Sequence, residues 1–162
     1  MNKQKYPLIF IVEDNTAFNK LVEHLLVSNG YKNVKIFSSG EECLKNIYLK
    51  PNIIIQDYKL QGISGLNVLQ RVKKILPLCE FVFLSGQDNV ETAVNTMKSG
   101  AFDYIVKNEN ALQRLIQIVD NIVRLQKLNK RNRRYILFAY FVLIILVFFL
   151  IILFFSSDVY FF

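Results

Sequence analysis

Polar side chains suited to phosphoryl chemistry stand at the ends of four short apolar runs in this sequence. Asp57 follows the run Ile-Ile-Ile-Gln, and the same place after three other runs is held by Glu13 with Asp14, by Ser85 and by Lys107. A carboxylate that accepts a phosphoryl group repels the incoming oxygens, and a divalent cation held by neighbouring carboxylates reduces that repulsion. A lysine can neutralise a further oxygen, and a hydroxyl can donate a hydrogen bond to another. The pattern predicts a cation-dependent phosphorylation site in which Asp57 is the acceptor.

The elements that position these groups are predicted by the apolar pattern. The runs are rich in β-branched and aromatic residues, which is typical of strands buried on both faces of a parallel sheet. Strands of such a sheet point the same way, so their polar ends emerge along one edge, where open α/β folds bind ligands. Helical spacing between the runs predicts five alternations of strand and helix, with Asn15 and Asp88 as N-caps of the first and fourth helices. The helix expected over 67–76 should direct four apolar residues, Ile75 among them, toward the core.

The basic character of the chain is confined to one segment. The net charge is +7, yet residues 1–123 carry 14 of the 20 Lys and Arg against 12 of the 13 Asp and Glu. The other six basic residues lie between Arg124 and Arg134, and a run without charge, Gly or Pro follows over 136–155. About 20 apolar residues in a helix span roughly 30 Å, the thickness of a bilayer's hydrocarbon core. We therefore expect a single transmembrane helix, with the N-terminal body kept in the cytoplasm by the preceding positive charges.

Two further features bear on the environment of the chain. Cys43 and Cys79 fall in no metal-ligand spacing, and we expect them to be reduced, apolar core residues of an intracellular domain. The basic segment beside the apolar run is expected to contact anionic lipid of the bilayer, and no nucleic acid partner is expected.

In this order and at these strand ends, the polar residues resemble the receiver domain of two-component response regulators, over about Tyr6 to Ile122. The resemblance implies an α/β fold: a flavodoxin-like, doubly wound sheet of five parallel strands in the order 2-1-3-4-5, followed by a long helix. It also implies a phosphoaspartate at Asp57, formed with Mg²⁺, whose phosphoryl group comes from a histidine kinase or a histidine phosphotransfer protein. Such a receiver is not an enzyme, because it promotes only its own phosphotransfer and dephosphorylation.

The resemblance also implies a role for each site residue. Lys107 and Ser85 would contact the phosphoryl group, and Ser85 with Tyr104 would form the switch that responds to it. The metal would be held by Glu13, Asp14, Asp57 and the backbone carbonyl of Lys59. Three positions depart from the usual pattern of the family: Gln61 and Asn108 stand where proline is usual, and Glu13 replaces the commoner aspartate.

The expected organisation is a receiver domain over 1–123, a basic juxtamembrane helix over 124–135, a transmembrane helix over 136–155 and a short tail over 156–162. The chain would then act at the inner (cytoplasmic) membrane as a membrane-anchored, single-domain receiver that signals through phosphorylation-controlled protein contacts. Its partner in these contacts would be another protein or a second copy of the chain, in a homodimer through the face of the fourth helix, fifth strand and fifth helix. Two alternative functions stay open at this point: a membrane adaptor that works without phosphorylation, and a phosphate sink for a histidine kinase.

Overall fold

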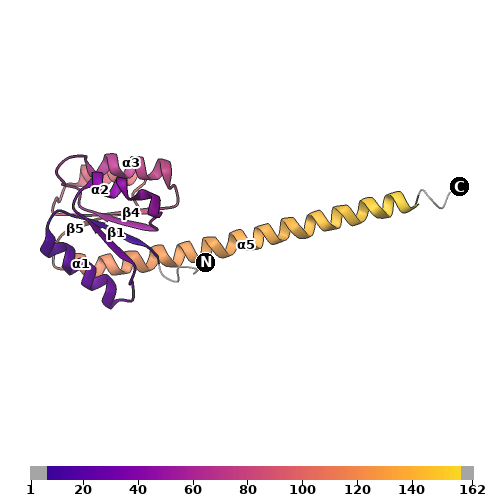
Figure 1. Cartoon of the computed structure of the whole chain (residues 1–162), viewed down its shortest axis with the longest axis horizontal. Helices are drawn as coiled ribbons and strands as arrows, with labels where there is room; N and C mark the ends of the chain where they lie inside the picture. The colour runs from indigo at the N-terminus through magenta and orange to yellow at the C-terminus, as the bar shows by residue number, and fades with distance from the viewer. Residues whose placement is uncertain (1–6, 158–162) are drawn as a thin grey trace. The chain divides into compact units, whose positions relative to one another are not determined.

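The structure of the chain, a computed structural model, describes the backbone of residues 7–157 and the side chains of residues 7–148. The chain divides between Ile122 and Val123 into two compact units. The first unit contains the sheet and the helices α1 to α4 (Figure 1).

Five parallel strands form one sheet in the order β2-β1-β3-β4-β5. Their bounds are β1 Ile9–Val12, β2 Val34–Phe37, β3 Ile53–Gln56, β4 Glu80–Ser85 and β5 Asp103–Val106. This topology confirms the predicted fold class. The register pairs Val12 with Gln56 and Ser85 with Val106, so the residues that follow β1 and β3 emerge side by side.

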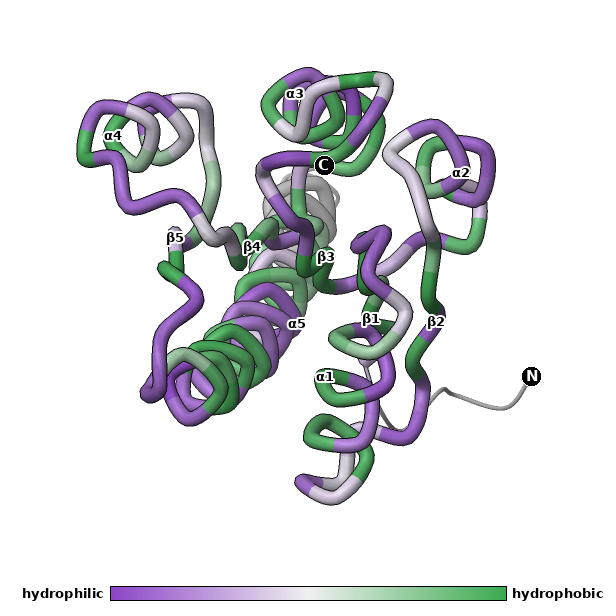
Figure 2. Tube along the Cα trace, turned by 90° about the vertical axis from the view of Figure 1, so that its left-hand side faces the viewer, coloured by the Kyte–Doolittle hydropathy of each residue, from purple (hydrophilic) through white to green (hydrophobic). Residues whose placement is uncertain are grey.

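Helices cover both faces of the sheet. Their bounds are α1 Thr16–Ser28, α2 Gly40–Lys45, a 3-10 turn η1 Ile47–Leu49, α3 Gly65–Ile75, α4 Val90–Lys98 and α5 Ala111–Ser157. Figure 2 shows α2, α3 and α4 on one face, with α1 and the first turns of α5 on the other. The long last helix that the sequence predicts is therefore present.

The core lies between these layers because alternate side chains of each strand point to opposite faces. On one face the central strands contribute Phe10, Ile54 and Phe81, all fully buried, which cluster with the inner side of α3. Helix α5 supplies Leu115, also fully buried. The strands are thus apolar on both sides, and polar groups are left to the ends of the strands.

Side-chain caps fix where the helices begin, and two predictions need correction. Asn15 caps α1 as predicted, accepting the N–H of Ala17. The predicted cap Asp88 is wrong by one residue, because Asn89 accepts the N–H of Thr92 and begins α4. Ile75 was expected to face the core but is 58% exposed, because α3 ends at this residue.

The predicted transmembrane helix over 136–155 is not supported. Among the residues that the structure describes, no helix is long and apolar enough to cross a membrane. Side chains are described only for 136–148 of the predicted span, fewer than the about 20 residues a bilayer requires, and arginines at 131, 133 and 134 precede it. The segment 149–155 lies outside the described side chains. The predicted membrane anchor therefore has no support from the part of the chain that the structure describes.

Candidate functional site

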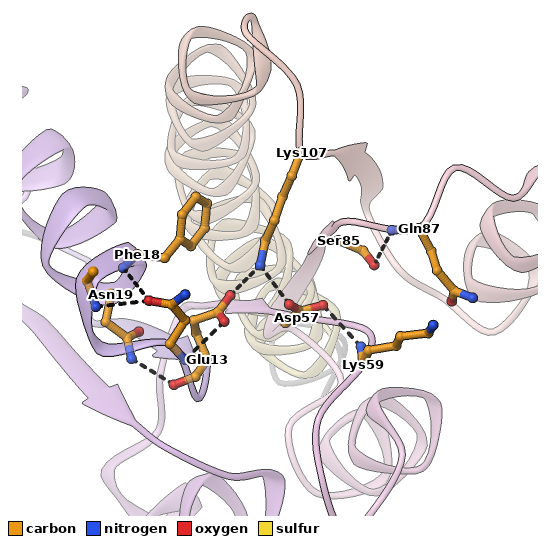
Figure 3. A network of polar contacts seen from close by, with 10 residues as sticks. Glu13, Phe18, Asn19, Asp57, Lys59, Ser85, Gln87 and Lys107 are labelled. Atoms are coloured by element: carbon orange, nitrogen blue, oxygen red, sulfur yellow. Dashed lines mark hydrogen bonds and ion pairs between the residues drawn. The ribbon is translucent and has the colours of Figure 1, made fainter.

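One ammonium group joins the ends of three strands. The Nζ of Lys107, which follows β5, donates hydrogen bonds to Glu13 Oε2 at 2.5 Å and to Asp57 Oδ2 at 2.6 Å (Figure 3). Glu13 follows β1 and Asp57 follows β3, so the contacts span 94 and 50 positions of the sequence. The parallel sheet is what brings these three residues together, as the sequence predicts.

Burial makes this ion cluster electrostatically strong. The Glu13 residue is only 4% exposed, and this loss of hydration raises the pKa of its carboxyl even though Lys107 bonds to it. Burial also works against the charge on Lys107, but its hydrogen bonds to Asp57 and Glu13 outweigh that effect and raise the pKa of the ammonium. The lysine is therefore a permanent cation beside the predicted acceptor.

The second oxygen of Asp57 is held by the loop that follows it. Asp57 Oδ1 accepts the backbone N–H of Lys59 at 3.0 Å. Lys59 thus lies beside the carboxylate, as Figure 3 shows, and both oxygens of the predicted acceptor have defined partners. These two hydrogen bonds fix the orientation of the Asp57 carboxylate before a phosphoryl group arrives.

The predicted switch residues meet at the loop after β4. Ser85 is fully buried, and its Oγ accepts the backbone N–H of Gln87 at 3.1 Å. The hydroxyl of Tyr104 donates to the carbonyl of the same Gln87 at 2.9 Å. The ring of Tyr104 is turned inward, with its centroid 6.3 Å from that of Tyr58 and 6.1 Å from that of Phe83. Ser85 and Tyr104 are therefore linked through one residue, Gln87, which the sequence pattern did not identify as their common partner.

Two residues of α1 support the cluster. The ring centroid of Phe18 lies 4.3 Å from the Nζ of Lys107, which is a cation–π contact. The amide of Asn19 donates to the main-chain carbonyl of Glu13 at 2.7 Å and is buried. Helical spacing alone places Phe18 on the apolar face of α1, and it cannot reveal a contact with a lysine so distant in sequence.

Two carboxylates of the site have the donor chemistry of a cation site. Glu13 and Asp57 both reach a single ammonium, so their carboxylates can share one cation, and Mg²⁺ commonly uses one or two carboxylates with water completing its shell. Asp14 is exposed, and within residues 7–148 no three acidic, His or Cys side chains are grouped closely enough to hold a metal. The donor chemistry of the pair fits Mg²⁺, while the predicted third carboxylate is not gathered with it.

Several known proteins are similar to this chain in sequence. The family model of the response regulator receiver domain matches residues 9–120. A response regulator NtrX-like protein of Rickettsia typhi is 36% identical over 127 residues, covering 76% of this chain and 26% of that protein. The nitrogen assimilation regulatory protein NtrX of Azorhizobium caulinodans is 34% identical over 128 residues, covering 77% and 28%. The chain therefore spans about a quarter of the length of these relatives.

Solved structures give the same result. A structure of NtrX from Brucella abortus superposes with a TM-score of 0.70 at 29% identity, covering 78% of this chain and 28% of that one. A receiver domain protein from Clostridium thermocellum gives a TM-score of 0.69 at 28% identity, covering 75% of this chain and 98% of that one. Fold, site geometry and the family match agree. The chain belongs to the family of response regulator receiver domains.

Proposed function

We propose that this receiver accepts a phosphoryl group on Asp57 from the phosphohistidine of a histidine kinase or a histidine phosphotransfer protein. The observation that carries the proposal is the partly buried ammonium of Lys107, bonded to both Asp57 and Glu13. Receiver domains interact with histidine kinases, so the family match supports such a kinase as the donor. Protein contacts that change on phosphorylation would then be the output.

In the proposed step a carboxylate oxygen of Asp57 attacks the phosphorus atom. The bond between phosphorus and the donor's imidazole nitrogen breaks, the nitrogen keeps the electron pair, and it takes up a proton from solvent. Phosphoryl transfer needs little covalent help from the protein, so positioning and charge stabilisation provide most of the rate. The hydrogen bond from Lys59 N–H to Asp57 Oδ1 provides the positioning.

Charge stabilisation comes from Lys107 and, when bound, from Mg²⁺. An ammonium has three N–H donors, and Lys107 uses two on Glu13 and Asp57, which leaves one for a phosphoryl oxygen. Mg²⁺ would reduce the repulsion between carboxylate and phosphoryl oxygens. Glu13, Asp57, the backbone carbonyl of Lys59 and, by the family resemblance, Asp14 are the groups that would hold it.

The switch would use the Gln87 link. Ser85 Oγ accepts a hydrogen bond from Gln87 in this structure, and a hydroxyl can instead donate to a phosphoryl oxygen by rotating about its Cα–Cβ bond. Such a rotation would release the Gln87 amide and disturb the carbonyl that holds Tyr104. The loop between β4 and α4 would thereby report the state of Asp57.

The test is incubation of the purified chain with a small acyl-phosphate donor, with and without Mg²⁺, followed by intact mass measurement. We expect wild type to gain the mass of one phosphoryl group only with Mg²⁺, and Asp57→Asn to gain none. A folded wild type that gains no mass in Mg²⁺ would contradict the proposal and favour an adaptor that works without phosphorylation.

A further inference from the structure

A glutamate of α2 forms a hydrogen bond to the backbone of the loop that follows Asp57. Glu41 is the second residue of α2, and its Oε1 accepts the backbone N–H of Ile63 at 2.7 Å. The two residues are 22 positions apart in the sequence. Ile63 lies just before α3 begins, so Glu41 ties the far end of the loop to a separate helix.

Two glycines permit this close approach. Gly62 has a φ of +87°, and a Cβ atom at this position would lie 2.4 Å from Glu41 Oε1. Gly40 precedes Glu41, and a Cβ there would lie 2.7 Å from Cγ2 of Ile63. A side chain at Gly62 would displace the carboxylate of Glu41 from the loop, and one at Gly40 would press against Ile63. The positive φ of Gly62 also disfavours other residues. The hydrogen bond between Glu41 and Ile63 therefore depends on a glycine in α2 and on a glycine in the loop.

The carboxylate of Glu41 is well suited to holding a backbone amide. The N–H of Glu41 itself and the N–H of Ile63 keep the pKa of this carboxyl below its usual value, so it is ionised. A hydrogen bond to an ionised carboxylate is stronger than one between neutral groups. Glu41 is exposed, so water competes for it, and the short approach that the two glycines allow favours the bond.

The near end of the same loop carries the groups at the acceptor. Lys59 donates its N–H to Asp57 Oδ1 at 3.0 Å, and its carbonyl is the one expected to face the metal. At the far end, a Cβ on Gly65 would lie 3.4 Å from the main-chain carbonyl of Asp57, so the start of α3 is packed against the acceptor's backbone. Movement at Ile63 would therefore displace both Lys59 and Gly65, the two residues of this segment that lie against Asp57.

We propose that Glu41 is a positioning residue for the phosphorylation of Asp57, acting by fixing the loop over 58–64 through the N–H of Ile63. This inference rests on the proposed function. Lys59 acts through its main-chain N–H and carbonyl, and the positions of these groups depend on the backbone of the loop. A residue that fixes the loop therefore also fixes these groups. Small displacements of positioning groups cost up to about a hundredfold in rate.

The experiment measures the initial rate of phosphoryl incorporation on the full chain over a range of Mg²⁺ concentrations, using an acyl-phosphate donor. For Glu41→Ala we expect the Mg²⁺ concentration at half-maximal rate to rise roughly tenfold, because the Lys59 carbonyl is no longer held in place. Glu41→Gln should recover most of this loss, since its amide oxygen can still accept the Ile63 N–H. Hydrogen exchange should show faster exchange of the Ile63 amide in Glu41→Ala.

A matched control lies one residue further along α2. Glu42 accepts the N–H and the hydroxyl of Ser38, at 2.9 Å and 3.1 Å, so its carboxylate supports the beginning of the helix. Glu42→Ala should leave the Mg²⁺ dependence unchanged. The inference is overturned if Glu41→Ala behaves as wild type, or if Glu42→Ala shifts the Mg²⁺ dependence equally. A wild type that takes up no phosphoryl group would instead overturn the proposed function, and this inference with it.

Discussion

At the scale of single residues, the site is organised by opposite charges in a buried place. Lys107 compensates Glu13 and Asp57 together, and Phe18 packs against its ammonium. A buried carboxylate that loses its partner is destabilising unless it takes up a proton. The native state therefore depends on Lys107 even without a phosphoryl group.

Replacing Lys107 by methionine tests this dependence. We expect Lys107→Met to lower the free energy of unfolding by about 3 kcal/mol at pH 7, while Lys107→Arg loses less because it keeps the charge. In wild type, burial raises the pKa of Glu13 and Lys107 lowers it, so we expect this pKa to rise further in Lys107→Met. The native variant then keeps a proton that its unfolded chain releases above about pH 4.5, so the deficit of Lys107→Met grows as the pH rises. Urea unfolding at pH 5 and pH 7 measures it, and an equal deficit at both would contradict this account.

Gln56 presents the opposite situation, a buried polar residue without compensation. It is fully buried next to Asp57, and neither of its side-chain polar atoms has a hydrogen-bond partner among the described residues. Unpaired buried polar groups cost about 1–3 kcal/mol each. We expect Gln56→Met, which preserves volume, to raise the free energy of unfolding by about 1–3 kcal/mol. A lower melting temperature than wild type would show that the amide has a partner, such as a buried water.

At the scale of elements, long-range polar contacts connect parts that the sheet does not pair. The hydroxyl of Tyr31, after α1, donates to Asp120 of α5 across 89 positions of sequence. Tyr31 is only 8% exposed, and burial, with the bond to Asp120 adding to it, raises the pKa of its hydroxyl. The contact joins the two helices that cover one face of the sheet.

Removing this hydroxyl should loosen the attachment of α5 to the sheet. We expect Tyr31→Phe to reduce the free energy of unfolding by about 1–2 kcal/mol, because a hydrogen bond to a charged group is lost while the ring stays packed. Asp120→Ala should cost a similar amount, and the double variant should cost little more than either, since both changes remove one bond. Additive losses in urea unfolding would show that the two side chains act separately.

The elements also show what sequence could and could not predict. Strand ends were predictable because β-branched runs buried on both faces are distinctive, and parallel strands must deliver their following residues to one edge. Contacts made by side chains across the fold were not, and for this reason Phe18 and Glu41 were missed. Helix α2 ends at Lys45 and is followed by the 3-10 turn η1, which ends where Lys50 adopts a left-handed φ of 57°.

At the scale of the whole molecule, stability should depend on pH through buried groups that cannot ionise. Cys43 and Cys79 are free and buried, as predicted, and burial raises the pKa of each thiol to about 12. Neither thiol is therefore a nucleophile in the folded protein at neutral pH.

An alkaline decline in stability follows from these thiols. Above about pH 9 the unfolded chain releases thiol protons that the native state retains, so the free energy of unfolding falls as the pH rises toward 12. Each thiol contributes at most about 1.4 kcal/mol per pH unit. Denaturant unfolding between about pH 8 and about pH 11 measures this decline. The free energy of unfolding should fall less steeply with pH in a variant with alanine at both positions. The same slope in both proteins would mean that other groups dominate.

The central claim is that Asp57 receives the phosphoryl group, and locating the modified residue tests it most directly. The phosphorylated chain is reduced with borohydride, which converts an acyl phosphate to an alcohol, and its peptides are then mapped by mass. We predict homoserine at position 57 alone, formed only when Mg²⁺ was present during phosphorylation. Modification at Glu13 or Asp14 with position 57 unchanged would contradict the account.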